Sequence, residues 1–354
     1  MKFHLDPEQV AIQETVYGAL TDALPREKLM AFLDEDADFE PRSWQAVMAL
    51  GLGGLMLPEE AGGSGLKLLD AALAIEALGK AAAPGPIMGQ LLAGLALNLS
   101  TNLAAKSKWL DKIASGDAIA AFAFDGTPDK WTVEVSEDQA TGSVGFVIGG
   151  LAADFFLVGT KGGGLAIVEC GDGAKVEPVQ STDRTRKLTR LTLDGAKVQI
   201  LFEPGDQGAA KVYDAALILI AADCLGGSGY CMDLSVSYAQ ERKQFGQPVA
   251  RFQALKHQLA TMALGVEPAR SLLWYAAYAW DAELPDVSRS AAIAKAHLCD
   301  RYTQITRDAI AAHGGIGYTW EYGLNIWFRR SVLNRALLGS PQVHRARAAE
   351  LAGW

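Results

Sequence analysis

Apolar residues recur at helical spacing through roughly the first hundred positions of the chain. Val10, Val16 and Leu20 follow a helix start at Asp6-Pro7, where a capping side chain and an N-terminal proline favour a helix. The same spacing predicts further helices that begin at Trp44 and cover residues 68–81 and 88–113. The first block of the chain is therefore predicted to be helical.

From Asp117 the spacing of apolar residues changes from that of a helix to the shorter spacing of β-strands. Short runs of β-branched and aromatic residues, bounded by Gly, Asp and Lys, occupy residues 118–124, 132–135, 145–148, 155–158, 165–168 and 191–193. Such runs are typical of a small antiparallel β domain. Beyond Pro204-Gly205 the helical spacing returns, over residues 212–241, 252–282 and 289–312 and in a final helix from Pro341. The pattern predicts three domains, at residues 1–116, 117–205 and 206–354, and hence an α+β protein.

The length, net charge and apolar content of the chain exclude some classes of function. A chain of 354 residues can form two or three domains with a large core. The net charge is −9 and the pI is near 5.2, which argues against nucleic acid or an anionic membrane surface as a partner. The segment Met1–Asp6 lacks an apolar signal core, and no uncharged apolar run has the length of a membrane span. We expect a cytoplasmic enzyme without membrane insertion.

The chain has four cysteines, none of them in CxxC spacing. Three of the four lie in apolar helical patterns, which favours buried, reduced thiols over a disulfide or a metal site. No metal ligand set is predicted.

A polar joint, ERKQFGQP at residues 241–248, separates two of the predicted C-terminal helices. Arg242, Gln244 and Gln253 offer guanidinium and amide donors, and Phe245 with the glycine after it offers an apolar wall and close backbone approach. This set suits a diphosphate or an adenylate. The same residues also match an ordinary helix C-terminus, with cations near the negative end of the dipole and a glycine stop.

A second motif, His313-Gly314-Gly315-Ile316-Gly317-Tyr318, follows about seventy residues later. The two motifs in this order resemble the C-terminal helical domain of the acyl-CoA dehydrogenase flavoproteins. The resemblance implies an FAD whose ADP half is held by this domain, usually the FAD of a neighbouring subunit. The cofactor-binding residues that it implies are Arg242, Gln244, Phe245, Gln253, His313, Gly314, Gly315, Ser340 and Gln342.

The resemblance covers essentially the whole chain. The order helical, β, helical is that of the family's fold, and Pro58-Glu59-Glu60-Ala61-Gly62-Gly63-Ser64-Gly65 is typical of the family's N-terminal domain. It implies an N-terminal helical domain, a middle antiparallel β domain and a C-terminal helical bundle. The implied activity is α,β-desaturation of a CoA thioester.

The catalytic base of the family is missing. A glutamate removes the α-proton while a hydride passes to the flavin, and an α-C–H is such a weak acid that the base must lie against it. Ungapped counting from the glycine motif places Leu338 at the common base position, and counting back from Arg242 places Ala216 at the alternative one. Asp214 lies two residues from Ala216 and so points to another face of the helix. No catalytic residue is predicted.

The residues that contact the flavin ring are also replaced. Residues 122–128, FAFDGTP, stand where the family has Thr-Glu-Pro-x-Ala-Gly-Ser-Asp, and residues 149–154 lack the preceding Trp-Ile-Thr/Ser. The second nucleotide motif is not whole either, because the Gln often found two residues before His313 is Ala311. The residues implied for the ring and the base are lost, while those retained are Arg242, Phe245, Gln253, Gly314 and Gly315.

This asymmetry predicts the short, non-base subunit of an α2β2 heterotetramer, as in acyl-CoA dehydrogenases of bacterial steroid and cholesterol side-chain degradation. It would act on an acyl-CoA only with a base-bearing partner subunit. Two alternatives stay open. One is a self-sufficient homo-oligomeric dehydrogenase or oxidase-like flavoenzyme with a displaced base, and the other is a flavin-free structural subunit.

Three weaker features receive structural interpretations. Trp320, Tyr322, Trp327 and Phe328 could line an acyl channel, but such aromatic residues more often pack a subunit interface. The turn Asp183–Arg186 is interpreted as a solvated charged run. His257 and His313 are interpreted as hydrogen-bonding structural residues rather than acid–base groups.

Overall fold

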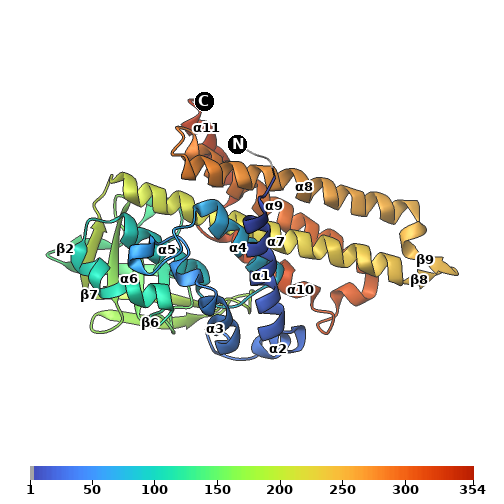
Figure 1. Ribbon diagram of the computed structural model, residues 1–354, viewed down its shortest axis with the longest axis horizontal. Helices are drawn as coiled ribbons and strands as arrows, with labels where there is room; N and C mark the ends of the chain where they lie inside the picture. The colour runs from blue at the N-terminus through green and yellow to red at the C-terminus, as the bar shows by residue number, and fades with distance from the viewer. Residues whose placement is uncertain (1–3) are drawn as a thin grey trace.

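The computed structural model describes residues 4–354 and shows helices, a sheet and helices in that order (Figure 1). Asp6 caps the first helix as predicted, accepting a hydrogen bond from the Gln9 backbone N–H at 2.9 Å while the Gln9 side chain accepts from the Asp6 N–H. The N-terminal helices are α1 (Pro7–Ala23), α2 (Arg26–Phe32), α3 (Pro41–Ala49), α4 (Leu68–Lys80), α5 (Ile87–Leu99) and α6 (Leu103–Ser115), with short 3-10 turns η1 (Leu52–Gly54) and η2 (Glu59–Ala61).

The middle part is one seven-stranded sheet in the order β1-β4-β5-β7-β3-β2, with β6 paired to β7. Every pair is antiparallel except β1–β4, which is parallel. The α+β class is confirmed, with this one parallel pair as an addition. The strands are β1 (Ala120–Ala123), β2 (Glu134–Ser136), β3 (Gln139–Ile148), β4 (Phe155–Thr160), β5 (Gly164–Glu169), β6 (Ala174–Val179) and β7 (Leu188–Phe202), and η3 (Pro128–Lys130) lies in the loop after β1.

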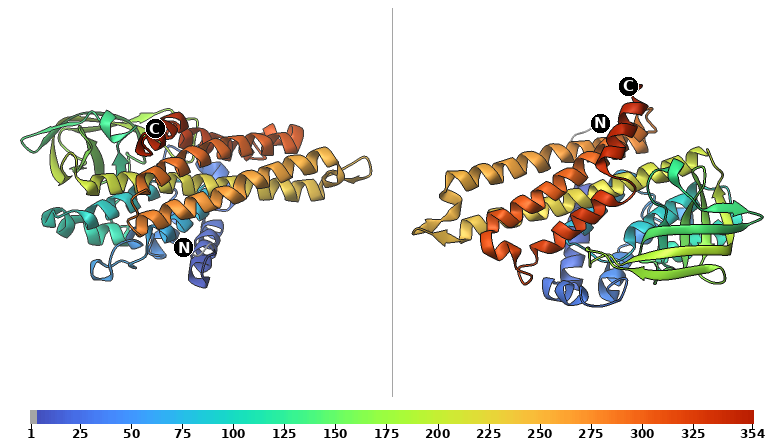
Figure 2. Two further views of the ribbon diagram at one scale, coloured as in Figure 1. Left: turned by 90° about the horizontal axis from the view of Figure 1, so that it is seen from above. Right: turned by 180° about the vertical axis from the view of Figure 1, so that it is seen from behind.

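The C-terminal part is a helical bundle around α7 (Gln207–Glu241), which has 35 residues. The other helices are α8 (Gln253–Asp281), α9 (Val287–His313), α10 (Leu324–Ala336) and α11 (Pro341–Leu351), and Figure 2 shows them side by side. By length and composition α7 could cross a membrane, but 83% of its most apolar window is buried in the fold. It is the core helix of the bundle, in contact with α4, α5, α8, α9 and α10.

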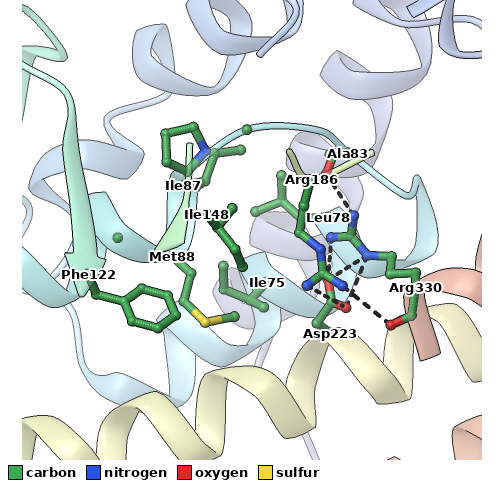
Figure 3. Close-up of a pocket in the computed structure, with 13 residues that line it drawn as sticks. Ile75, Leu78, Ala83, Ile87, Met88, Phe122, Ile148, Arg186, Asp223 and Arg330 are labelled. Atoms are coloured by element: carbon green, nitrogen blue, oxygen red, sulfur yellow. Dashed lines mark hydrogen bonds and ion pairs between the residues drawn. The ribbon is translucent and has the colours of Figure 1, made fainter. Parts of the chain in front are cut away.

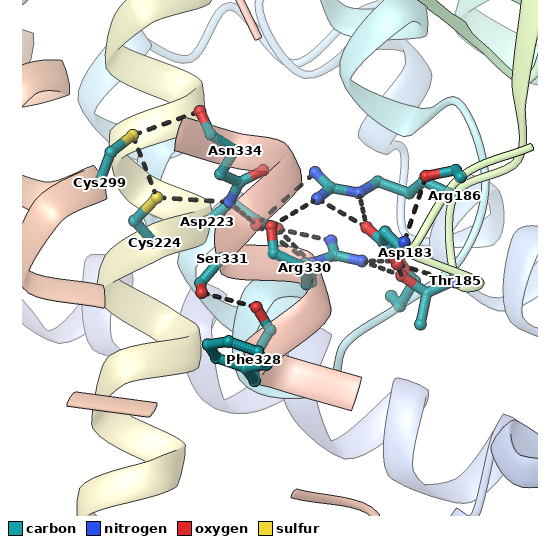
Figure 4. Close-up of polar contacts among 12 residues, drawn as sticks. Asp183, Thr185, Arg186, Asp223, Cys224, Cys299, Phe328, Arg330, Ser331 and Asn334 are labelled. Carbon is teal, nitrogen blue, oxygen red and sulfur yellow. Dashed lines mark hydrogen bonds and ion pairs between the residues drawn. The ribbon is translucent and has the colours of Figure 1, made fainter. Parts of the chain in front are cut away.

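A buried polar network joins the three parts (Figure 4). Arg330 of α10 pairs with Asp223 of α7, donates to the Ala83 carbonyl oxygen at 3.0 Å, and donates to Thr185 Oγ1 at 2.9 Å. Arg186 pairs with Asp183 at 2.9 Å. The prediction of a solvated turn at Asp183–Arg186 was therefore wrong, because three of its four residues are buried.

The structure differs from two further expectations, one on an aromatic residue and one on a cysteine. Trp327 packs inside the chain rather than at a subunit interface or channel, stacked on Tyr230 at 4.1 Å and donating to the Gly79 carbonyl oxygen at 3.2 Å. Cys224, Cys231 and Cys299 are buried free thiols as predicted, whereas Cys170, at the end of β5, is exposed.

Candidate functional site

The polar joint forms a tight hairpin at the far end of the bundle. β8 (Lys243–Gln244) pairs with β9 (Gln247–Pro248), and η4 (Val249–Arg251) leads from it into α8. The turn needs positive φ at both central residues, and Phe245 (+51°) and Gly246 (+76°) supply it. Phe245 is 91% exposed and lies edge-on to Phe252 at 6.0 Å. The hairpin therefore presents an aromatic ring to solvent at a cost in backbone strain.

The glycine motif lies at the same end. α9 ends at His313, whose ring packs on Tyr238 in the last turns of α7 at 4.4 Å, and η5 (Gly314–Tyr318) follows. His313 is buried, and its Nδ1 lies 2.7 Å from the Ala309 carbonyl oxygen. A Cβ added to Gly314 or to Gly315 would meet no atom within 4 Å. The structure thus brings the two motifs together, with His313 as a packed side chain and the glycines as open backbone.

Ser340 and Gln342 lie elsewhere. Ser340 caps α11, accepting from the Val343 N–H at 3.5 Å, and Gln342 is exposed in the first turn of that helix. The preceding residue is held by Lys295 of α9, whose Nζ donates to the Gly339 carbonyl oxygen. Lys295 and His313 are eighteen residues apart on one helix, or about 27 Å. Ser340 and Gln342 are therefore at the opposite end of the bundle from Arg242.

The two predicted base positions meet at that opposite end. Leu338 is fully buried with φ of +53°, and its carbonyl oxygen accepts from Tyr213 Oη at 3.2 Å and lies 2.8 Å from His344 Nε2. Ala216 lies three residues after Tyr213 on α7 and is also fully buried. Both positions are occupied by apolar side chains in the main hydrophobic core.

A row of packed aromatic rings lies between this point and the sheet. Trp131 meets Tyr213 edge-on at 6.0 Å, Phe124 meets Trp131 at 5.1 Å, and Phe122 meets Phe124 at 5.1 Å. These distances are those of packed aromatic pairs. All four rings are buried, and burial raises the pKa of Tyr213, which keeps its hydroxyl protonated as a donor.

Comparison with known families decides the identity. The model of the acyl-CoA dehydrogenase N-terminal domain matches residues 6–117, and that of the C-terminal domain matches residues 214–352. The chain belongs to the acyl-CoA dehydrogenase family. It is an acyl-CoA dehydrogenase by enzyme class, and the cofactor of this class is FAD.

Three known proteins are similar to this acyl-CoA dehydrogenase over most of its length. Acyl-CoA dehydrogenase IpdE2 of Mycolicibacterium smegmatis is 31% identical over 96% of each chain. Acyl-CoA dehydrogenase FadE34 of Mycobacterium tuberculosis is 32% identical over 92% of this chain but only 45% of its own length. Among solved structures, the Tcur3481-Tcur3483 steroid ACAD is 27% identical over 98% of each chain, with a TM-score of 0.90.

The hairpin end and the Leu338 end of this chain differ in how well their residues fit the FAD of the acyl-CoA dehydrogenase family. At the hairpin, Arg242, Gln244 and Gln253 are exposed, and the open glycines leave backbone within reach of a ligand. Guanidinium and amide donors beside an aromatic wall suit the ADP half of FAD. At the Leu338 end, Phe124, Trp131 and Tyr213 pack on one another where the ring-contacting segment was expected. The ADP end fits the cofactor. At the other end the predicted base positions are buried, and a hollow of about 290 Å³, lined by Phe124, Gly126 and Trp131 among others, lies beside the packed rings.

Asp214 is the buried carboxylate next to Tyr213. It pairs with Arg347 at 3.1 Å and accepts from Ser288 Oγ. Burial raises its pKa while Arg347 opposes that rise. Both carboxylate oxygens are engaged, so Asp214 supports the junction of α7, α9 and α11 and is not free to act as a base.

A small cavity remains between the N-terminal helices and the sheet (Figure 3). Apolar side chains including Ile75, Met88 and Phe122 line one wall, and Asp223 with Arg330 lies at the other. Its volume is about 20 Å³, which holds one water molecule. It has no room for an acyl group.

The sequence analysis predicted base positions at Leu338 and Ala216 but did not predict the polar residues that contact the Leu338 segment. Tyr213, Lys295 and His344 all hold carbonyl oxygens of the Leu338-Gly339 turn, and none stands in a motif. The available signal was weak, because each is a single polar residue in an otherwise apolar or mixed helical pattern. No group of three or more metal-ligating side chains occurs within residues 4–354.

Proposed function

We propose that this chain is the non-base subunit of a heterotetrameric, FAD-dependent acyl-CoA dehydrogenase. In this proposal its hairpin end completes the FAD site of a base-bearing partner subunit. The observation that carries the proposal is the contrast between an open hairpin end and two predicted base positions that are apolar and fully buried, with Tyr213 donating to the Leu338 carbonyl oxygen.

The hairpin end supplies binding and orientation. The Arg242 guanidinium would bind the diphosphate as a planar cation, and the amides of Gln244 and Gln253 would add donors beside it. Phe245 would cover an apolar face of the cofactor, and the Gly314-Gly315 backbone would approach it closely. FAD, when bound, supplies the hydride acceptor for the desaturation.

The Leu338 end supplies no proton acceptor for the reaction. Neither base position carries a carboxylate, and both are buried in the core, so an acyl thioester has no space against them. Proton abstraction requires a base in contact with the α-carbon. It therefore falls to the partner subunit, and each pair of chains would have one active site.

The relatives support a paired arrangement. FadE34 matches this chain over less than half of its length, so it has room for a second segment of comparable size. The solved steroid ACAD carries a double name, Tcur3481-Tcur3483, which fits an enzyme made of two different chains. Because the solved relative is a steroid ACAD, we propose that the substrate is the CoA thioester of a steroid side chain. The proposed location is the cytoplasm, and the proposed domain boundaries are those predicted from the sequence.

Flavin counting tests the proposal. The chain is purified alone and co-purified with the dehydrogenase-like chain encoded beside it, and FAD is measured per chain from the visible spectrum. We expect a colourless or unstable lone chain and about one FAD per two chains in the pair. A yellow lone chain with one FAD each and turnover would instead establish a self-sufficient enzyme. A stable, flavin-free pair would establish a structural subunit.

A further inference from the structure

α9 has one face that no other part of the described chain covers. Its other faces pack against α7, α8, α10 and α11. The side chains that reach solvent recur at helical spacing from one end of the helix to the other. We call this face the α9 stripe, and it consists of Arg289, Ile293, His297, Arg301, Gln304 and Arg307.

The α9 stripe is cationic in an acidic protein. Residues 287–354 contain nine lysines and arginines against four carboxylates, a net charge of +5 in a chain whose total is −9. Two of these cations, Arg330 and Arg347, pair with Asp223 and Asp214 outside the segment, which leaves a charge of +3 on it. Such separation of charge within one chain favours a partner of the opposite sign on the cationic part.

Carboxylates near the stripe neutralise only part of its charge. Asp286 lies 3.6 Å from Arg289, and Asp300 pairs with both Arg335 and Arg345 at 2.9 Å. Asp308 accepts a hydrogen bond from Gln304 at 3.0 Å. Within residues 4–354, Arg301 and Arg307 form no ion pair. The middle of the stripe therefore keeps two exposed guanidinium groups.

A groove lies beside the first turns of the stripe, between α9 and α11. Its volume is about 340 Å³, and its apolar lining consists of Ile293, Trp354 and alanines of α9, of α11 and of the residues after it. Arg289, His297 and Arg345 also line it. A hollow with an apolar floor and charged groups beside it suits one large apolar side chain with carboxylates around it.

The other end of the stripe leads to the proposed cofactor end. Arg307 lies less than two turns before His313, where η5 and its open glycines begin. A partner that covered the α9 stripe would reach the hairpin end along the same helix. The stripe and the shared FAD site would then form one continuous interface.

We propose that the α9 stripe is the surface on which the base-bearing partner subunit docks. The partner would present carboxylates to Arg301 and Arg307 and one apolar side chain to the groove. The inference rests on the proposed function. It adds an electrostatic reason why this chain would pair with a different subunit rather than with a second copy of itself. A two-fold contact between two copies of this chain would place the same cationic face on both sides, which is repulsive, whereas an acidic partner is attracted.

Charge reversal on the stripe tests the inference. The variant Arg301→Glu with Arg307→Glu is mixed with the base-bearing dehydrogenase chain encoded beside this one, and the dissociation constant is measured by titration calorimetry. The matched control is Arg190→Glu with Lys197→Glu, which makes the same charge change at exposed positions of β7. We expect the stripe variant to bind about tenfold more weakly or worse and the control to bind as the parent does.

Salt dependence provides a second measurement of the same interface. Affinity of the parent pair should fall when sodium chloride rises from about 50 to about 500 mM, because exposed charges are screened over a shorter distance. The stripe variant should lose most of this dependence. Equal affinity and equal salt dependence in parent and stripe variant would overturn the inference.

Two outcomes separate this inference from the proposed function. If the stripe variant pairs normally while Arg242→Ala removes FAD from the pair, the docking surface is wrong and the shared cofactor site stands. A lone chain that forms a tetramer by native mass spectrometry, and that the stripe variant dissociates, would assign the stripe to a second copy and would also overturn the inference.

Discussion

Tyr213 donates a hydrogen bond to the carbonyl oxygen of Leu338 at 3.2 Å, and this contact lies at one of the two base positions predicted from the sequence. Tyr213 lies on α7 and Leu338 lies between α10 and α11, 125 positions later in the chain. The Leu338 side chain belongs to the main hydrophobic core. The predicted base position is therefore occupied by an apolar side chain and held by a long-range polar contact.

Restoring a carboxylate at this position should destabilise the chain without creating activity. In Leu338→Glu a carboxylate would replace a fully buried apolar side chain of the main core, which should cost about 3 kcal/mol or more of the free energy of unfolding. Urea unfolding and turnover of a CoA thioester measure the two effects. The control is Leu351→Glu at a half-exposed position of α11, which should be nearly neutral. Turnover by Leu338→Glu with parental stability would show that the site is open.

Removing the cation of the hairpin should affect cofactor retention alone. Arg242 is exposed and takes part in no side-chain hydrogen bond within residues 4–354. Arg242→Ala should lower the FAD affinity of the proposed pair by about tenfold to a hundredfold, as expected for a lost charge-assisted hydrogen bond. Retained flavin after gel filtration and the melting temperature are the measurements. Arg190→Ala is the control, and an unchanged FAD content in Arg242→Ala would remove the hairpin from the site.

Removing the Arg330 cation from the buried polar network should lower the free energy of unfolding much more than removing the neighbouring cation of Arg329. Arg330→Met leaves Asp223 buried without its main cation, an effect of about 3–5 kcal/mol. Arg329→Met changes the adjacent, partly exposed residue of the same helix and should stay near parental stability. Denaturant unfolding of both variants gives the comparison. Similar stabilities for the two would mean that the pairing of Arg330 with Asp223 contributes little.

The pH dependence of stability should carry a contribution from His344. Burial, together with the nearby Lys295 cation, lowers the pKa of His344 from 6.5 to about 4 in the folded chain. The unfolded chain then binds a proton between these values while the folded chain does not, so stability rises with pH across this window. The contribution is fully present above about pH 6.5 and is lost as the pH falls toward about 4, up to about 3 kcal/mol.

The variant His344→Gln isolates this contribution. Urea unfolding of parent and variant at about pH 7 and about pH 5 should show a smaller loss of stability in His344→Gln. His257→Gln, at an exposed position of α8, serves as the control and should keep the parental pH dependence. An equal loss in parent and His344→Gln would refute the assignment to His344.

The sequence by itself determined the order of the fold and the chemistry of its retained motif. Helical spacing, the change of period after Asp117 and its return after Gly205 depend on local patterns, and such patterns report which face of an element is buried. The cap at Asp6 and the glycines of the second motif were likewise visible, because each acts within a few residues. β6 was missed because Pro178 argues against a central strand, whereas β6 lies off the main strand order and pairs with β7.

Only the tertiary structure decided what surrounds the two ends of the site. Local sequence predicts a solvated turn at Asp183–Arg186, and only Arg330 and Asp223, distant in sequence, bury it. The pairing of Tyr213 with Leu338, and the separation of Ser340 from Arg242 along α9, likewise follow from the packing of helices far apart in the chain. Periodicity shows that a face is buried, whereas the identity of the group that covers it depends on long-range packing, and that packing leaves the hairpin of this dehydrogenase exposed and its predicted base positions buried.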